Sequence, residues 1–290
     1  MPYTAGGPAD AILRAISPDL QKRWGQPLVI EYKPGANEIL GAMEMAKAKP
    51  DGHTMLIATD ATYALNPLLK TKLPFNPEKD FAPISLMMRA PLLMITRPDF
   101  PANTVKEVVD YVRANPDKAS YASTGIGGSN HLAASWFNKA NGLQSVHVPY
   151  NNLSLALQDM AASRVDMSLV VTGGARAFLE KKSVKPIAVS GTKRQPLLPD
   201  VPTFAEAGYK DYEASVYFGL AAPAQTPLGI RERIAADIGE LISTPEFQKK
   251  YLAIYGFEPV GSTPEFFAAF LKSDKAATLK RIEAAGVQPE

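Results

Sequence analysis

The sequence predicts an α/β protein whose strands and helices alternate around a parallel, doubly wound sheet. Short apolar runs typical of buried strands recur along the chain, and most precede a small-residue loop and a segment with helical apolar periodicity. Such alternation favours helices packed on both faces of a parallel sheet. The chain has 290 residues, of which 46% are hydrophobic and 21% are charged. This is enough for two domains of ordinary size with substantial cores.

The N-terminal part alternates between helix and strand. Apolar residues at helical spacing predict a helix from about Ile12 to Trp24, which Gly25 ends. Asn37 can cap a second helix, which ends before Pro50. The strands predicted here are residues 28–32 (LVIEY) and 54–58 (TMLIA).

The middle of the chain repeats this scheme, and the C-terminal part is mostly helical. Strands are predicted at 119–123, 145–149, 164–171, 185–191 and 214–222, with helices between them. Three later segments open with Thr-Pro, a capping residue followed by a proline at the first helical position, and each predicts a helix.

Two stretches, 95–104 and 212–222, are candidate crossovers between domains. A chain that crosses at both builds its first domain from its two ends and its second domain from its middle. The predicted domains are therefore residues 1–98 with 220–290, and residues 99–219. This division rests partly on the family resemblance given below.

Charge and residue content exclude several classes of function. Lys and Arg number 31 against 29 Asp and Glu, a net charge of +2, so no nucleic acid partner is expected. The absence of cysteine excludes disulfides, thiol catalysis and cysteine-ligated metal sites. The three histidines, His53, His131 and His147, have no metal-ligand spacing, and no H-E-x-x-H or G-x-S-x-G motif appears. No metal, cofactor or catalytic residue is predicted.

Two glycine-rich stretches precede predicted helices: YTAGGPAD (residues 3–10, the first glycine loop) and STGIGGSNH (residues 123–131, the second glycine loop). One interpretation is a plain helix start or a flexible loop. The other is an anion site, because bare amides before a helix N-terminus can donate to a negative group. On this interpretation Gly6 and Gly7 leave their amides free for a carboxylate. Neither loop matches a nucleotide-binding motif.

Neighbouring residues are expected to support these loops. Asp10 lies in the first turn of its helix, where it can stabilise the first glycine loop. His131 is expected to cap a helix rather than transfer protons, and His147 is interpreted as a strand histidine. A third strand–loop–helix junction, ATDATYALNP (residues 58–67), adds hydroxyl and carboxyl groups to the rim of the first domain.

In their order along the chain these motifs resemble the Bug family of periplasmic substrate-binding receptors, also called TctC-like. Further segments with this likeness are VHVPYNN, FGLAAPAQTP and GTKRQPLLPDVPTFAEAG, the last being the most specific. The likeness spans essentially the whole chain. It implies a two-domain periplasmic-binding-protein fold of type II-like architecture, with two crossover strands and a ligand cleft between the domains.

The resemblance also implies a function. The chain is expected to be an extracytoplasmic solute-binding receptor, not an enzyme, which captures a small organic carboxylate and delivers it to membrane transporter subunits. A periplasmic monomer without a cofactor is expected. The alternative is a ligand-sensing effector domain that acts on a signalling partner. An enzyme on this fold is the third class, but its deaminase version needs a cysteine that this chain lacks.

Carried over position by position, the resemblance implies a set of ligand-binding residues. On one side of the cleft they are Tyr3, Thr4, Ala5, Gly6, Gly7 and Asp10, and on the other Ser123, Thr124, Gly127, Gly128, Ser129 and Asn130. The remainder of the site is expected to be lined by Thr59, Asp60, Tyr150, Val171 and Phe218.

Three positions depart from the family pattern. The family places an export signal and a whole strand before the first glycine loop, whereas here only Pro2 and Tyr3 represent that strand, so the chain is expected to begin after a removed segment. Val170 stands where many relatives carry Asp, which favours an apolar or aromatic carboxylate. Asp60 stands where Asn is common, which leaves an amino or hydroxy acid open. We expect one firmly held carboxylate and an apolar body.

Overall fold

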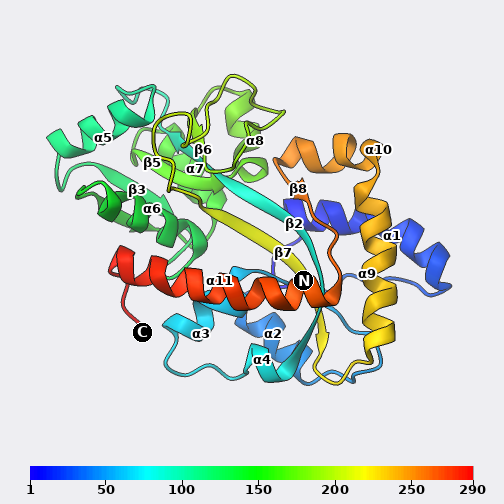
Figure 1. The fold of residues 1–290 in the computed structure, drawn as a ribbon. Coiled ribbons are helices and arrows are strands. Elements are labelled where there is room, and N and C mark those ends of the chain that lie inside the picture. The colour runs from blue at the N-terminus through cyan, green and yellow to red at the C-terminus, as the bar shows by residue number, and fades with distance from the viewer. Residues whose placement is uncertain (290) are drawn as a thin grey trace. The chain divides into compact units, whose positions relative to one another are not determined.

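Two strands carry the chain between the two units of the protein. The computed structural model describes residues 1–289. Unit 1 comprises Met1–Arg89 and Tyr217–Leu279, and unit 2 comprises Ala90–Val216 and Lys280–Gln288. Two unit boundaries fall inside β2 (Phe81–Thr96) and β7 (Ser215–Pro223), which are neighbours in the sheet (Figure 1). A third falls inside α11 (Pro264–Ala285), between Leu279 and Lys280. The domain bounds at 98/99 and 219/220 stay a prediction.

Unit 1 combines a small antiparallel sheet with helices from both ends of the chain. Strand β1 pairs antiparallel with β7, and β8 pairs antiparallel with β2. The elements of this unit are α1 (Pro8–Trp24), α2 (Ile39–Ala46), β1 (Leu56–Ala58), η1 (Ala61–Leu65), α3 (Asn66–Leu69), α4 (Pro77–Asp80), α9 (Leu228–Ser243), α10 (Pro245–Phe247), η2 (Gln248–Leu252), η3 (Ala253–Tyr255), β8 (Glu258–Pro259) and most of α11 (Pro264–Ala285). Its core is rich in aromatic residues, among them Tyr63, Phe81, Tyr217 and Phe267.

Unit 2 is an α/β layer with helices on both faces of its sheet. Strand β3 pairs parallel with β4 and β5, and β2 pairs antiparallel with β5 and β6. Successive residues of β2 belong to different cores: Leu92 and Met94 pack with α5 and α6, whereas Leu93 and Ile95 pack with α7 and α8. The elements are α5 (Val105–Ala114), β3 (Ser120–Ser123), α6 (Ser129–Ala140), β4 (Val146–Pro149), α7 (Leu153–Ala161), β5 (Met167–Val171), α8 (Thr172–Glu180) and β6 (Lys185–Val189).

The predicted parallel sheet is confirmed only in part, because the sheet is mixed. Within the described chain the parallel pairs of strands are β3 with β4 and β3 with β5, and one isolated parallel bridge joins Val189 to Thr203. The described pairs of β1 and β2 are antiparallel. Strand β2 escaped prediction, because its long apolar run does not alternate and contains Pro83 and Pro91.

Three local predictions are wrong. The N-cap position of α9 is Pro227 rather than Thr226, whose buried hydroxyl has no hydrogen-bond partner among the described residues, so this Thr-Pro pair lies one residue too early to cap the helix. Residues 28–32 are extended but do not form a strand. In the described chain their backbone partner is the single residue Met1, through the carbonyl of Glu31 and the neighbouring amide of Lys33, and one residue cannot build a ladder. The N-cap position of α2 is Glu38 rather than Asn37.

Candidate functional site

The first glycine loop joins a left-handed glycine to an extended one at the start of α1. Gly6 has φ 87°, a conformation that favours glycine, and Gly7 is the N-cap with φ −77° and ψ 168°. The Gly6 amide donates to the Asp10 carboxylate at 2.8 Å. The expectation of free amides at both glycines is therefore wrong for Gly6, because Asp10 already occupies its amide.

Asp10 stabilises this loop, as expected from its place in the first turn. Its carboxylate, 4% exposed, also accepts from the Tyr32 hydroxyl at 2.7 Å and from Arg14 Nε at 3.0 Å. Burial opposes the charged form, but the hydrogen bonds from Gly6, Tyr32 and Arg14 outweigh it and lower the pKa of Asp10. The carboxylate is thus ionised at neutral pH and committed to partners within the protein.

Gly7 has no structural need to be glycine. Its backbone angles suit any residue, and a Cβ built there meets no heavy atom within 4 Å. Space in front of the α1 N-terminus is therefore open, which is the arrangement that close approach of an anion requires.

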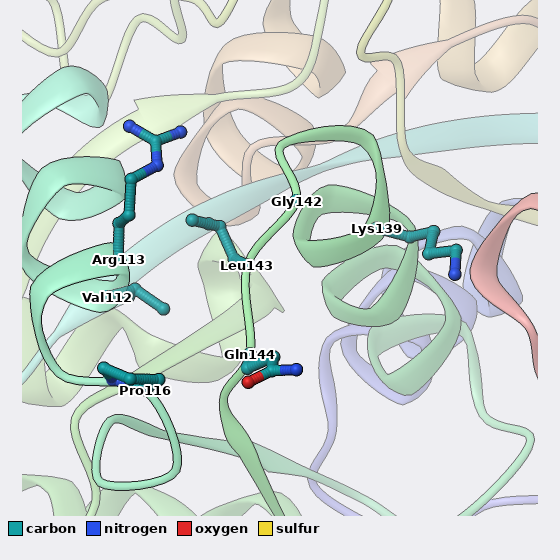
Figure 2. Close-up of a pocket in the computed structure, with 7 residues that line it drawn as sticks. All are labelled: Val112, Arg113, Pro116, Lys139, Gly142, Leu143 and Gln144. Carbon is teal, nitrogen blue, oxygen red and sulfur yellow. The ribbon is translucent and has the colours of Figure 1, made fainter.

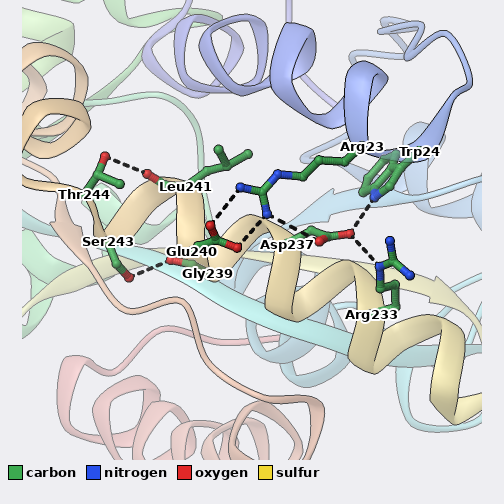
Figure 3. Close-up of polar contacts among 9 residues, drawn as sticks. All are labelled: Arg23, Trp24, Arg233, Asp237, Gly239, Glu240, Leu241, Ser243 and Thr244. Atoms are coloured by element: carbon green, nitrogen blue, oxygen red, sulfur yellow. Dashed lines mark hydrogen bonds and ion pairs between the residues drawn. The ribbon is translucent and has the colours of Figure 1, made fainter.

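The C-terminal end of α1 is fixed to α9, which holds the helix behind the first glycine loop (Figure 3). The Trp24 indole donates to Asp237 at 2.8 Å, and Arg23 bonds Glu240 through two nitrogens at 2.7 and 3.0 Å. Arg233 adds a further bond to Asp237 at 3.2 Å. These contacts are structural and lie at the opposite end of α1 from Gly7.

Sequence reasoning missed Glu38, which organises the rest of the unit 1 site. Its carboxylate is 6% exposed and accepts from the hydroxyls of Tyr3, Thr59 and Thr62, and from the Thr59 amide at 3.4 Å. Burial raises the pKa of Glu38, and these hydrogen bonds offset part of the rise. In the sequence Glu38 resembles an ordinary acidic residue at the start of a helix. The one local signal for its burial is its position directly before an apolar run.

Glu38 brings together several residues that were predicted to bind ligand. Because the hydroxyls of Tyr3 and Thr59 donate to Glu38, their protons point into the protein. The Tyr3 ring also meets Phe218 edge-to-face, with centroids 6.4 Å apart. Asp60 is buried at 8% exposure, and its charge, after burial and Glu38, helps to raise the pKa of Tyr3. Direct ligand contacts of these residues stay a prediction.

The second glycine loop repeats the backbone of the first. Gly127 is left-handed with φ 75°, and Gly128 is the N-cap of α6 with φ −76° and ψ 160°. Both N-cap residues are glycines, so neither makes a side-chain cap. The first residue of α1 is Pro8, which has no amide hydrogen, and in α6 the His131 amide is already bonded to Asn130 Oδ1. Each unit therefore carries the same pair of glycines before a helix, but the first-turn amides that remain for an external acceptor differ between the two.

Side chains within the second glycine loop hold it together. The Asn130 Oδ1 accepts from the Thr124 amide at 3.3 Å, the Thr124 hydroxyl at 3.2 Å and the His131 amide at 3.0 Å. The Ser123 hydroxyl accepts from the Gly125 amide, donates to the Gly125 carbonyl and contacts His147 Nε2 at 2.6 Å. A hydroxyl makes three such bonds at most, so Ser123 reaches a ligand only if one of them breaks.

Parallel strands place the other unit 2 candidates at one edge of the sheet. Strands β3 and β5 end at Ser123 and Val171, and Tyr150 follows the end of β4. Since parallel strands share a carboxyl edge, these residues lie together where α/β proteins bind ligands. The Tyr150 hydroxyl donates to Asp159 at 2.8 Å, and burial followed by this bond raises its pKa to about 12. Its ring, rather than its hydroxyl, is then available.

The remaining candidates differ in what they can offer a ligand. Thr4 and Ala5 are exposed. Among residues 1–289 the Ser129 hydroxyl has no protein partner, so it can bond an incoming group. Val170 packs in a unit 2 core, so its apolar side chain gives no information about the ligand, contrary to the sequence argument.

Other sites give little support for a different chemistry. In the described part of the chain no group of three or more His, Asp or Glu side chains could hold a metal ion. None of the helices there has the length and apolarity needed to cross a membrane. A hollow of about 410 Å³ in unit 2 is lined by Val112, Arg113, Pro116, Lys139, Gly142, Leu143 and Gln144, with the two cations extending away from its apolar floor (Figure 2). It contains none of the predicted ligand-binding residues.

The whole chain is similar to proteins of one receptor family. The family model described as "Tripartite tricarboxylate transporter family receptor" (TctC) matches residues 12–287. The "UPF0065 protein in tcbD-tcbE intergenic region" of Pseudomonas sp. (strain P51) is 33% identical over 275 residues, which cover 94% of this chain and 81% of that protein.

Solved structures agree with this match. One described as "R. palustris Rpa4515 with adipate" has a TM-score of 0.93 and 29% identity, and the match covers 100% of this chain and 96% of that one. "MatC (Rpa3494) from Rhodopseudomonas palustris with bound malate" has a TM-score of 0.84 and 28% identity, with 98% and 96% covered. The resemblance and the two-domain α/β fold class are confirmed, and such proteins are substrate-binding receptors rather than enzymes. The chain belongs to the TctC family of tripartite tricarboxylate transporter receptors.

Proposed function

We propose that this chain captures a small organic carboxylate and delivers it to a membrane transporter as an extracytoplasmic receptor. The observation that carries the proposal is the repeated arrangement of a left-handed glycine, an extended glycine N-cap and a helix, found once in each unit. Among the described residues no contact with a Cβ, and no backbone angle, requires position 7 to be glycine, whereas close approach of a ligand to the backbone would. We propose that the predicted site residues act through these two loops.

Hydrogen bonds and helix dipoles at the two glycine loops can bind a carboxylate without the help of an arginine side chain. Each charge-assisted hydrogen bond from an amide or hydroxyl stabilises the complex by about 1.5–3 kcal/mol, and each helix N-terminus adds roughly 0.3–1 kcal/mol. A few such bonds, less the costs of association and ordering, give a micromolar Kd. Binding the carboxylate by amide, hydroxyl and helix dipoles also requires no buried arginine or lysine. Such a cation would be left without a partner when no ligand is bound.

We propose a ligand with one firmly held carboxylate and an apolar body. The solved relatives contain adipate and malate, both dicarboxylates. Here Ile126, 55% exposed, places an apolar side chain beside the α6 N-terminus. In unit 1 the buried carboxyl groups of Glu38 and Asp60 disfavour a second carboxylate near them. These features support an apolar body beyond the bound carboxylate.

Membership of the family supports a proposal about location and partners. We propose that the receptor works in the periplasm as a monomer and hands its ligand to the membrane subunits of a tripartite tricarboxylate transporter. We further propose that each glycine loop contributes to carboxylate binding. Substitution of either loop should then weaken that binding.

A ligand panel tests this function. The chain is melted with adipate, malate, benzoate or aspartate at about 100 times the expected Kd, and with adipamide as the uncharged control. A bound carboxylate adds about 2.7 kcal/mol at that concentration and should raise the Tm by several degrees, while adipamide should not. If no carboxylate raises the Tm, or if a member of the panel is chemically converted, the proposed function is wrong.

A further inference from the structure

Two adjacent imidazole rings, of which His131 is buried and His147 is partly exposed, contact the second glycine loop and have no part in the proposal above. His131 in α6 is 8% exposed, and its ring centroid lies 4.2 Å from that of His147 in β4. Tyr121 in β3 stacks on His147 with centroids 4.9 Å apart. Partners on three elements thus hold both rings in place.

The bonds of His131 indicate its protonation state. Its Nδ1 accepts from the Gly127 amide at 3.3 Å, so this nitrogen carries no proton. The proton then sits on Nε2, which faces the Ser135 hydroxyl at 3.5 Å, and Ser135 bonds the Tyr121 hydroxyl at 3.1 Å. The ring is neutral in this arrangement, since a charged imidazole has no acceptor to offer Gly127.

The surroundings of His131 favour the neutral form. The titratable groups that face it are His147 from β4 and Tyr121 from β3. Burial, followed by the charge that His147 can carry, lowers the pKa of His131 to about 4. The acceptor at Nδ1 is therefore present throughout the neutral pH range.

The first glycine loop contains the same bond. There the left-handed Gly6 donates its amide to the side chain four residues further on, Asp10, just as Gly127 donates to His131. Both acceptors are the third residue of their helix, because α1 begins at Pro8 and α6 at Ser129. The unit 1 pair also shows that a side chain as short as Asp reaches this amide, at 2.8 Å.

We infer that His131 is a positioning residue for the anion-binding loop of unit 2, which it fixes by holding the Gly127 amide with a neutral acceptor. The inference rests on the proposed function. While His131 holds the Gly127 amide, Gly128 has its extended N-cap conformation, and the N-terminus of α6 has no cap from the side chain of its N-cap residue. A neutral acceptor also places no negative charge beneath a bound carboxylate, unlike Asp10 in the first loop.

Three substitutions separate these roles. His131→Leu removes the acceptor, His131→Asn keeps a neutral acceptor, and His131→Asp keeps the acceptor but adds a negative charge. His53→Leu is the matched control, because the His53 side chain is 76% exposed. The first readout is amide hydrogen exchange at Gly127 in the ligand-free protein, followed by NMR, and the second is the Kd for adipate.

We expect His131→Leu to speed exchange at Gly127 about tenfold or more and to weaken adipate binding by a similar factor, as loss of one buried hydrogen bond implies. His131→Asn should restore both to within about threefold, and His131→Asp should restore protection but not affinity. His53→Leu should change neither. Unchanged exchange or unchanged affinity in His131→Leu would overturn the inference.

Nitrogen-15 NMR of the wild-type imidazole gives a test that needs no variant to fold. It should find the His131 proton on Nε2, and a proton on Nδ1 would refute the inference. If the wild-type protein does not bind adipate but His131→Leu speeds amide exchange at Gly127 as expected, the role of His131 at that amide is supported and the proposed ligand class is wrong. The two failures are therefore distinguishable.

Discussion

The buried carboxylate of Glu38 offers a sharp test of how the unit 1 site is built. Glu38→Ala leaves three hydroxyl donors, on Tyr3, Thr59 and Thr62, without their acceptor. Each loss costs about 1 kcal/mol or more in a buried site. Removing the carboxylate also relieves a burial penalty, which its raised pKa indicates and which offsets part of this loss. We expect a net loss of about 2 kcal/mol in the free energy of unfolding.

Urea unfolding measures this loss in unit 1 alone. The chain has two tryptophans, and Trp136→Phe leaves Trp24 as the fluorescent reporter of unit 1. In that background Glu38→Gln should lose only about 1 kcal/mol, because it keeps one carbonyl acceptor. Glu44→Ala, on the exposed face of the same helix, is the control and should change little. If Glu38→Ala has the same urea midpoint as the control Glu44→Ala, the proposed role of Glu38 as the acceptor that stabilises the unit 1 site is refuted.

Two further predictions concern pH and the link between α1 and α9. Burial lowers the folded-state pKa of His131 and of His147. Between about pH 4 and pH 6.5 the unfolded chain therefore binds more protons than the folded chain. The free energy of unfolding consequently falls as the pH drops through this window. Urea unfolding at pH 7 and pH 5 should differ by on the order of 1 kcal/mol, with a smaller difference in His131→Asn, and equal stability at both pH values would contradict this. Asp237→Ala removes the acceptor of Trp24 and of two arginines and should cost about 1–3 kcal/mol by Trp24-reported unfolding. Glu240→Ala, whose carboxylate is 70% exposed, should cost less, and the reverse order would contradict the account.

Much of the fold was predictable because its signals are local. Gly25 in the left-handed conformation ends α1, and Thr244 and Thr263 accept amide bonds at later helix starts, as the Thr-Pro pattern indicates. The two glycine loops were recognised for the same reason, since glycines and helix periodicity lie next to each other in sequence. The bracing role of Asp10 depends on a residue only four positions away and was predicted too.

What could not be predicted depends on residues far apart in sequence. Glu38 meets Tyr3 and Thr59 across 35 and 21 positions, and no local pattern announces that contact. The Nδ1 bond of His131 is local, but its neutral state depends on burial in the folded protein and, after that, on the charge that His147 of β4 can carry. The extended segment 28–32 does not form a strand, because a strand needs a neighbouring chain segment to pair with as well as a high β-propensity.

The central claim is that backbone at the glycine loops binds a carboxylate, and Gly7→Val tests it most directly. A side chain at Gly7 fits the protein without strain, so folding should be unchanged. Gly229→Val is the matched control, because Gly229 also lies in the first turn of a helix with open space around it. Isothermal titration with the tightest carboxylate of the panel should give a Kd at least about tenfold weaker for Gly7→Val, about 1.4 kcal/mol, and an unchanged Kd for Gly229→Val. Near-native affinity in a folded Gly7→Val variant would contradict the account.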